Sequence, residues 1–317
     1  MILRFEEIKK ITVGAPYMEN TDEGMRFYKY NPNLFSVWTN HRKVFGQRVR
    51  STTGIRLDFH TNSRRMDLEI AERSRFEIYI DGLFRYSMRD TEKLSVDIYT
   101  SLDQPLDDVR ITIYFPSHDE GIIKSLELDD GAYVKPHKFD KKILFMGDSI
   151  TQGWASEFDS LSYANRLSRY FNADSVIQGV GGACFYDDCL EKLPFEPDWV
   201  IVAYGTNDFK TYNSLEDFNI HLRAYMSKLS VLYGDKKVFV ISPIWREDRT
   251  PKDRLTFEEC RHAIISEAQE NGFIHLDGSC LVPHDLSFYT DGLHPNDTGF
   301  YVYANNLIKA LDKELNT

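Results

Sequence analysis

The sequence lacks the marks of several common protein classes. It has four cysteines in 317 residues, and their spacings match no zinc or redox motif. It contains no run of about 18 apolar residues that could cross a membrane, and its first residues lack the basic start and apolar stretch of a signal peptide. We therefore expect free thiols, no membrane segment and a soluble, cytoplasmic protein.

Positive charge is also scarce. The chain carries 38 Lys and Arg against 49 Asp and Glu, a formal net charge of −11. Nucleic-acid-binding proteins draw their affinity from clusters of Lys and Arg, so we expect no nucleic-acid partner. Most of the acidic excess lies in residues 139–317, which hold 17 basic and 27 acidic groups. A neutral or sugar-like substrate suits that half better than a polyanion.

The first part of the chain has a strand pattern. Four short runs alternate apolar with polar side chains, as half-buried antiparallel strands do. They are residues 55–59, 66–70, 76–80 and 109–115. Asp81-Gly82 follows one of them and is a strong signal for a two-residue hairpin. Because 317 residues exceed the usual size of one core, we predict two domains, the first a β-sandwich of jelly-roll type over residues 1–138.

After Pro136 short apolar runs alternate with helical stretches. The runs are typical of strands buried in a parallel sheet, and they are residues 143–146, 175–177, 199–203, 237–241 and 273–276. Residues 215–229 and 300–311 each show one apolar helix face, and Asn296-Asp297-Thr298 is a good cap for the second helix. This order predicts an α/β domain over residues 139–317 with a flavodoxin-like, doubly wound parallel sheet, whose ligands bind at the carboxyl ends of the strands.

A serine follows the first strand of this domain. Ser149 lies between Gly147 and Gly153, which suits a tight strand-to-helix turn that presents a hydroxyl at the edge of the sheet. The segment is not the Gly-x-Ser-x-Gly elbow of α/β-hydrolases, because residue 151 is Thr. The alternative interpretation is that Asp148 or Ser149 only caps the next helix.

A histidine able to activate this serine follows the last strand. A neutral imidazole such as that of His294 can remove a hydroxyl proton at physiological pH. Asp291 stands three residues earlier, close enough in a loop to accept a hydrogen bond from Nδ1 and fix the tautomer of the ring. The alternative is a turn in which Asp291 caps locally and His294 is exposed.

Donors for an oxyanion are the third component. Asn207 follows the strand at 199–203, and residues 179–182 are Gly-Val-Gly-Gly, a backbone that another group can approach closely. The side chain of Asn207 and the N–H groups of Gly182 and Ser149 would make a three-donor oxyanion hole. Taken singly, Asn207 fits a turn and the glycines fit a loop. Their joint occurrence with Ser149 and His294 favours catalysis.

Together these segments resemble the SGNH hydrolases, also called GDSL-type esterases. The four blocks of that superfamily correspond to Gly147-Asp148-Ser149, the glycine stretch ending at Gly182, Gly205-x-Asn207-Asp208 and Asp291-x-x-His294. Ile150 departs from the fourth letter of the first block, and which glycine donates is left open. With a β-rich module ahead of these blocks, the chain is similar to two-domain carbohydrate acetylesterases of the superfamily, and in layout to two-domain SGNH acyltransferases.

The same region admits other chemistry. Six potential metal ligands crowd into 20 residues, namely His275, Asp277, His284, Asp285, Asp291 and His294. No His-x-x-x-His or Cys-x-x-Cys pair accompanies them, so we expect no metal and no cofactor. Cys184 and Cys189 flank an aromatic and acidic segment near the glycines, but neither has a base nearby in the sequence that would make it a nucleophile.

Candidate substrate contacts follow the strand ends. They are Asp148, Trp154, Trp245 and Arg246. With Tyr186 and Phe209, the two tryptophans could form an aromatic platform for a sugar ring or wall the domain interface. The polar segment 246–254 is typical of a loop at the rim of a site.

The resemblance implies a serine esterase that acts on a small-molecule or carbohydrate ester, with O-acetyl as the favoured group. An acyltransferase with the same acyl-enzyme and an alcohol acceptor is the alternative. A carbohydrate-binding platform without catalysis is disfavoured, because binding does not require Ser149, Asn207 and His294 together. The acyl length, the alcohol, the role of the N-terminal domain and the oligomeric state stay open.

Overall fold

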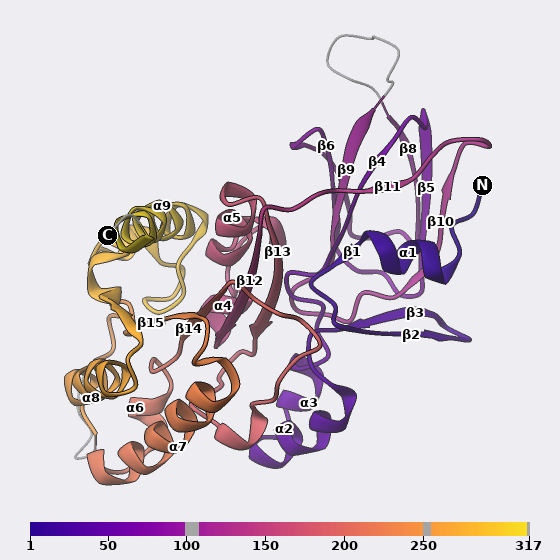
Figure 1. The fold of residues 1–317 in the computed structure, drawn as a ribbon. Coiled ribbons are helices and arrows are strands. Elements are labelled where there is room, and N and C mark those ends of the chain that lie inside the picture. The colour runs from indigo at the N-terminus through magenta and orange to yellow at the C-terminus, as the bar shows by residue number, and fades with distance from the viewer. Residues whose placement is uncertain (99–107, 250–254, 316–317) are drawn as a thin grey trace.

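The computed structural model describes residues 1–98, 108–249 and 255–315 (Figure 1). Within these residues the first part of the chain forms two antiparallel sheets and the second part forms a parallel sheet. No helix in these described ranges combines the length and the apolar character that crossing a membrane requires.

The two antiparallel sheets enclose one apolar core. The first has the order β1 (Thr12–Val13), β4 (Arg56–Thr61), β9 (Val109–Tyr114), β6 (Phe76–Ile80), β7 (Leu83–Met88), with β11 (Lys135–Pro136) paired to β4. The second has the order β2 (Tyr17–Thr21), β3 (Gly24–Tyr28), β10 (Ile123–Leu128), β5 (Arg65–Ile70), β8 (Lys93–Asp97). Buried side chains from both sheets, such as Phe59 and Leu68, belong to one cluster, which confirms the predicted sandwich.

The predicted hairpin joins β6 to β7. Ile80 pairs with Leu83, and the two residues between them, Asp81 and Gly82, have φ values of 48° and 76°. A two-residue turn with both central residues in the left-handed region matches the twist of the flanking strands. The Asp-Gly pair therefore identified this turn from the sequence.

Helices also occur in this first part, where the sequence pattern predicts none. α1 (Phe5–Ile11) contacts β4, and a helical segment of η1 (Pro32–Leu34), α2 (Phe35–His41) and α3 (Phe45–Arg48) follows β3. These helices are too short to show a helical period. Their buried Trp38 and Phe45 pack in the same core as α7 (Leu215–Tyr233) of the second part. The division between residues 138 and 139 stays a prediction.

The second part contains the predicted parallel sheet. Its order is β13 (Ala173–Gly179), β12 (Lys141–Gly147), β14 (Trp199–Ala203), β15 (Lys237–Ile241), β16 (Ile274–Leu276), with every neighbouring pair parallel. In chain order this is 2-1-3-4-5, the flavodoxin-like arrangement. The predicted fold class is confirmed.

Helices cover both faces of this sheet. Leu144 and Met146 of β12 pack with α7 and α8 (Phe257–Glu270), and Ile143 and Phe145 pack with α5 (Tyr163–Tyr170) and α9 (Asp297–Leu315). The remaining short elements are α4 (Ser149–Gln152), η2 (Asp159–Leu161), η3 (Asp187–Cys189), α6 (Asp208–Thr211), η4 (Gly278–Cys280) and η5 (Leu286–Phe288). Asn296 accepts a hydrogen bond from the N–H of Gly299 at 3.0 Å, so the predicted cap of α9 is present.

Candidate active site

Ser149, His294 and Asp291 are joined by hydrogen bonds. Ser149 Oγ lies 2.9 Å from His294 Nε2, and His294 Nδ1 lies 2.7 Å from Asp291 Oδ2. Ser149 is 5% and His294 9% exposed, whereas the side chain of Asp291 is 50% exposed. The sequence allowed a turn with an exposed histidine, but the structure buries the ring against the serine.

Asp291 is held in place by more than the imidazole. Its Oδ1 accepts from the N–H groups of Leu293 at 3.0 Å and His294 at 2.8 Å. Partial burial disfavours the ionised carboxyl, but the hydrogen bonds from the backbone and ring of His294 outweigh it and lower the pKa of Asp291. An ionised carboxylate accepts from Nδ1–H and leaves Nε2 free to accept a proton from Ser149.

The turn after β12 leaves the serine hydroxyl free for chemistry. Asp148 caps α4, because its Oδ1 accepts from the N–H of Ile150 at 2.9 Å. A Cβ at Gly147 would lie 2.0 Å from Thr151 Oγ1, so only glycine fits there. Asp148 is 2% exposed. The structure thus buries this carboxyl, although the sequence suggested a contact with substrate.

A second buried carboxyl joins the loops around the site. Asp208 accepts from the N–H groups of Phe185 and Gly205, both at 3.0 Å, and so connects the loop after β13 to the loop after β14. Burial raises the pKa of Asp148 and of Asp208 to about 7. A cavity of about 20 Å³ adjoins Asp148 and Thr206, which is room for one water molecule.

Gly182 is the glycine of the loop whose N–H is unused. The N–H of Val180 donates to Gly147 O at 3.0 Å, and that of Gly181 donates to Gln152 Oε1 at 2.8 Å. The N–H groups of Gly182 and Ser149 have no acceptor among the residues that the structure describes. Gly182 also has a φ of 83°, a conformation that favours glycine.

The side chain of Asn207 lies next to this loop. Its Nδ2 donates one hydrogen bond, to Ala183 O at 3.0 Å, which leaves its second hydrogen unused. Gln152 of α4 binds Gly181, so the serine helix, the glycine loop and Asn207 converge. The structure therefore brings together the three donors that the sequence singled out.

The candidate substrate contacts do not form one aromatic platform. The Trp154 side chain is 37% exposed, and its ring lies 6.1 Å from that of His294, between centroids. Trp245 stacks on His284, at 5.7 Å, whereas Phe209 is buried. Only Trp154 among these rings is placed beside the His294 ring.

Arg246 is buried rather than solvated. It is 5% exposed, its Nη1 donates to Thr206 O at 2.7 Å, and its guanidinium lies 5.0 Å from the centre of the Phe209 ring. The sequence suggested a charged side chain at the rim that could reach substrate. Residues 250–254 of that segment lie outside the described residues.

Residues from the first part of the chain reach the site, which the sequence did not predict. Arg48 donates to Gly181 O, 133 positions away, and lies 5.5 Å from the centre of the Trp154 ring. The ring of His118 packs edge-on against Trp154 at 4.9 Å. Gln152 donates to Ser117 O at 2.7 Å. No local pattern signals contacts at such separations.

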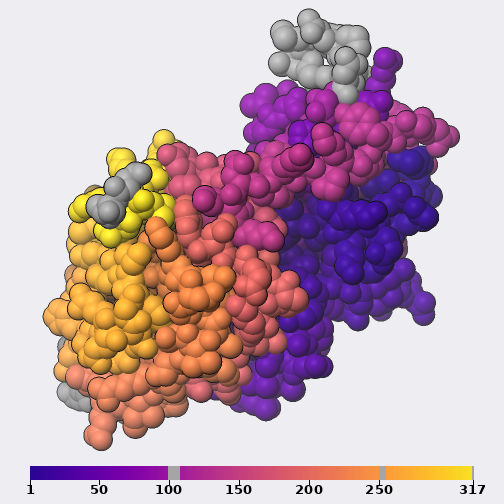
Figure 2. Space-filling view, viewed as in Figure 1, coloured from indigo at the N-terminus to yellow at the C-terminus, as the bar shows by residue number. Residues whose placement is uncertain are grey.

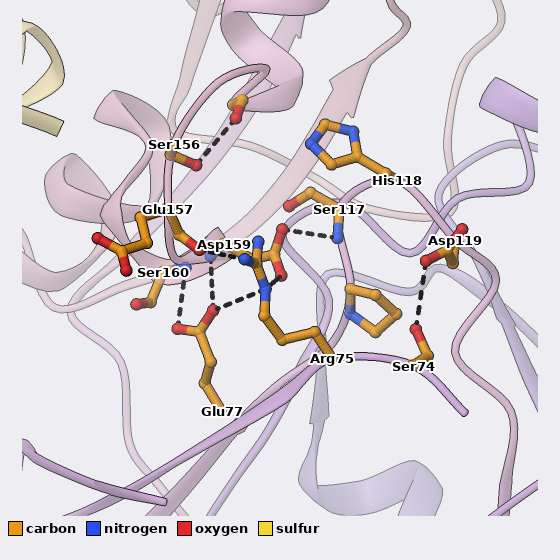
Figure 3. Close-up of polar contacts among 12 residues, drawn as sticks. Ser74, Arg75, Glu77, Ser117, His118, Asp119, Ser156, Glu157, Asp159 and Ser160 are labelled. Carbon is orange, nitrogen blue, oxygen red and sulfur yellow. Dashed lines mark hydrogen bonds and ion pairs between the residues drawn. The ribbon is translucent and has the colours of Figure 1, made fainter. Parts of the chain in front are cut away.

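A polar network ties the segment after Trp154 to the antiparallel sheets (Figure 3). Asp159 of η2 accepts from Arg75 Nε at 2.8 Å and from the N–H of Ser117 at 3.0 Å. Glu77 of β6, which is fully buried, accepts from the N–H groups of Asp159 and Ser160. Burial raises the pKa of Glu77. The placement of the loop that carries Trp154 therefore depends on both parts of the chain.

Five of the six residues weighed as metal ligands have other partners, and the Nε2 of the sixth, His275, is buried without a hydrogen bond to any residue that the structure describes. Asp277 pairs with Arg261 at 2.7 Å, and Asp285 accepts from the N–H of Ser287 at 2.8 Å. Across the described part of the chain, the one group of possible ligand atoms within 4.8 Å of one another belongs to His41, Asp188 and Cys189, and the His41 ring already bonds Asp188.

The cysteines are poorly suited to nucleophilic attack. All four are free, and Cys184 and Cys189 are buried. Burial raises the pKa of both thiols, which disfavours the reactive thiolate.

The site lies within a stretch that matches a known family. Residues 145–301 match the GDSL-like Lipase/Acylhydrolase family. This part of the chain belongs to that family. The GDSL domain contains Ser149 and His294, and it makes the chain a carboxylic ester hydrolase, as the resemblance implied. No curated protein matches the chain.

Solved structures similar to this GDSL protein extend over both of its parts. A salicylyl-acyltransferase from a tetracycline biosynthetic pathway has 17% identity and a TM-score of 0.80, covering 95% of this chain and 94% of that one. A putative GDSL-like lipase from Bacteroides ovatus has 18% identity and a TM-score of 0.76, covering 100% and 98%. A family two carbohydrate esterase from Clostridium thermocellum, in complex with cellohexaose, has 15% identity and a TM-score of 0.68, covering 96% and 99%. The shared feature is the fold.

Proposed function

We propose that this GDSL protein is a serine esterase that removes small acyl groups, above all O-acetyl, from a carbohydrate. The observation that carries the proposal is the hydrogen-bonded chain from Ser149 through His294 to Asp291, with two distances of 2.9 and 2.7 Å. Nothing in the packing of the fold requires a buried hydroxyl, a buried imidazole and a half-exposed carboxylate in this order.

In the proposed reaction Ser149 Oγ attacks the ester carbonyl while His294 Nε2 takes its proton. The N–H groups of Ser149 and Gly182 and the free Nδ2 hydrogen of Asn207 donate to the oxygen that becomes negative. The imidazolium then protonates the leaving alcohol, and Asp291 stabilises the positive ring. A water molecule, deprotonated by His294, releases the acid and restores the hydroxyl.

Two observations support a carbohydrate as the alcohol. Trp154 offers a partly exposed ring beside His294, where the leaving alcohol would depart, and sugars commonly pack on such rings. The similar fold of the Clostridium thermocellum carbohydrate esterase adds weight to the proposal.

Replacing Ser149 tests the proposal directly. Ser149→Ala should lower turnover of acetylated sugars by about 10⁴-fold with the fold retained. Ser156→Ala is the matched control, since Ser156 is buried shortly after α4 and its hydroxyl donates only to Gly153 O at 2.9 Å. Activity that survives in Ser149→Ala, or that chelators abolish and zinc restores, would rule out the serine mechanism. Rates on acetyl against longer acyl esters test the size of the acyl group.

An acyltransferase is the second candidate, favoured by the likeness in fold to the salicylyl-acyltransferase. Both reactions share the acyl-enzyme and differ in what attacks it. Adding alcohols or sugars to the assay and measuring whether product shifts from free acid to a new ester separates the two. Free acid as the sole product across a range of acceptors would exclude the acyltransferase and support the esterase.

A further inference from the structure

Two arginines from the first part of the chain converge on the glycine loop. Arg42 follows α2 and Arg48 ends α3. A Cβ placed on Gly182 would lie 3.1 Å from Nη1 of Arg42 and also 3.1 Å from Nη1 of Arg48. The two guanidinium groups therefore lie next to each other, beside the unused N–H of Gly182. In the space-filling view the N-terminal residues, in indigo and purple, are in direct contact with the second part (Figure 2).

Neither of these arginines has an acidic partner. Some other arginines of the chain are paired, for example Arg75 with Asp159 and Arg110 with Asp58, both at 2.8 Å. Among the described residues, no carboxylate lies within the 4.0 Å of an ion pair from Arg42 or Arg48. Burial and the neighbouring charge of Arg42 lower the pKa of Arg48. Two unpaired like charges in a chain of net charge −11 indicate a place for an anion that the protein does not itself supply.

Arg48 is held in place by its neighbours, whereas Arg42 is exposed and packs on one ring. Arg48 donates to Gly181 O and lies over the Trp154 ring, and Arg42 lies 5.4 Å from the centre of the Phe45 ring. The buried Lys29 donates to Arg48 O at 3.3 Å and to Ser51 O at 2.6 Å, which fixes the backbone just after α3. Side chains fixed before binding lose less freedom when a ligand arrives.

The position of the pair also shows which part of a substrate would meet it. Arg48 contacts both Gly181, beside the oxyanion donors, and Trp154, beside the histidine that would protonate the leaving alcohol. An acetyl group carries no charge of its own. An anion at this place must therefore belong to the alcohol, close to the ester.

We propose that the alcohol of the substrate carries one anionic group, a carboxylate or a phosphate, and that Arg42 and Arg48 bind it. This inference rests on the proposed esterase function and narrows its substrate class to acidic acetylated sugars. The guanidinium fork matches the oxygens of both anions. The overall negative charge of the second part disfavours a polyanion, but a single anionic group meets a local pair of positive charges.

Turnover of three matched substrates tests the inference. They are acetylated methyl glycosides of one sugar that differ only at C6, which is a hydroxymethyl, a carboxylate or a phosphate ester. The wild type should favour one anionic sugar over the neutral sugar by about 10-fold or more in kcat/KM, since a hydrogen bond to a charged group is worth that much. The two anionic arms separate carboxylate from phosphate.

Arg42→Gln should remove most of that preference, by about 10- to 100-fold in the ratio of kcat/KM values. Arg50→Gln is the matched control, because Arg50 is an exposed arginine of the same segment that bonds to Gly46 O at 3.1 Å and lies over Phe35. The control should leave the ratio unchanged. If the wild type hydrolyses the three sugars equally, or if Arg42→Gln keeps the preference, the inference is wrong while Ser149-dependent hydrolysis still supports the esterase.

Binding gives a readout that does not need turnover. The free methyl uronoside, the free sugar phosphate and the neutral glycoside are titrated into Ser149→Ala protein by calorimetry at low salt. One anionic sugar should bind at least about 10-fold more tightly than the neutral one. Introducing Arg42→Gln into the Ser149→Ala protein, or raising the salt concentration, should abolish the difference in affinity. Equal affinities overturn the inference whatever the activity. An effect of Arg42→Gln confined to esters with a charged acyl group, such as succinyl, would also overturn it, because the anion would then belong to the acid.

Discussion

Replacing Asp291 with alanine should slow the enzyme much less than the loss of a fully buried triad carboxylate would. The side chain of Asp291 is 50% exposed, so water can take its place as the acceptor for His294 Nδ1–H. Of the three hydrogen bonds that are lost, the one that bears on the rate is the bond to an imidazole that becomes charged, worth about 1.5–3 kcal/mol. That corresponds to a decrease of about 10- to 150-fold in kcat/KM, against about 10⁴-fold for a buried triad aspartate.

The asparagine variant of Asp291 should be less active than the alanine variant. In Asp291→Asn the side-chain oxygen can keep the bonds from the N–H groups of Leu293 and His294, which places the amide NH₂ against Nδ1. A donor there favours the tautomer that carries its hydrogen on Nε2, where it cannot take the proton of Ser149.

Steady-state rates on an acetylated sugar, with thermal unfolding as a check on folding, measure both effects. Asp285→Ala is the control, since Asp285 is also in this C-terminal region and caps its own turn through the N–H of Ser287. A loss near 10⁴-fold in Asp291→Ala would refute the argument from exposure. Unchanged activity would remove Asp291 from the mechanism, and an asparagine variant as active as the alanine variant would refute the tautomer argument.

Gly182→Ala should lose stability and activity together, because its φ of 83° disfavours a side chain by about 1–2 kcal/mol and a Cβ would press on two arginines. The control is Gly131→Ala, with a φ of 80° and open space around it, which should lose stability in urea unfolding through the backbone effect alone and keep its kcat/KM. Asp148→Asn should change how stability depends on pH. Because burial raises the pKa of Asp148 from its usual 3.8 to about 7, its contribution to stability is complete below pH 4 and is lost as pH rises through 7. Asparagine can keep the cap and cannot ionise, so the free energy of unfolding measured in urea should become increasingly larger for the variant than for the wild type between pH 5 and 8. Parallel curves of this free energy against pH for the two proteins would contradict the prediction.

The sequence predicted those features that depend on local patterns. Alternation and an Asp-Gly pair identified strands and a hairpin, and apolar runs followed by polar residues located the carboxyl edge of the parallel sheet, where Ser149 and Asn207 lie. The sequence could not predict that Arg48 reaches Gly181 across 133 positions, because no periodicity reports such a contact.

The sequence also failed to predict which charged side chains are buried. Asp148 and Arg246 follow strands, where polar residues are usually exposed, but each has a backbone partner that allows it to be buried, the N–H of Ile150 and the carbonyl of Thr206. A cytoplasmic location and the absence of a nucleic-acid partner remain predictions of the sequence.

The N-terminal part also covers one edge of the parallel sheet. β13 is an edge strand of seven residues, and an uncovered edge is a template for pairing with another chain. Here Arg56 donates to Ala173 O at 2.7 Å, Tyr30 donates to Gln178 O at 3.2 Å, and Gly54 packs so closely that a Cβ would lie 2.5 Å from Ile177. A chain cut after residue 138 would lose this cover, and we expect it to aggregate through β13. The part of the chain that contacts the site through Arg48 and His118 therefore also covers the edge of the hydrolase sheet through Arg56, Tyr30 and Gly54.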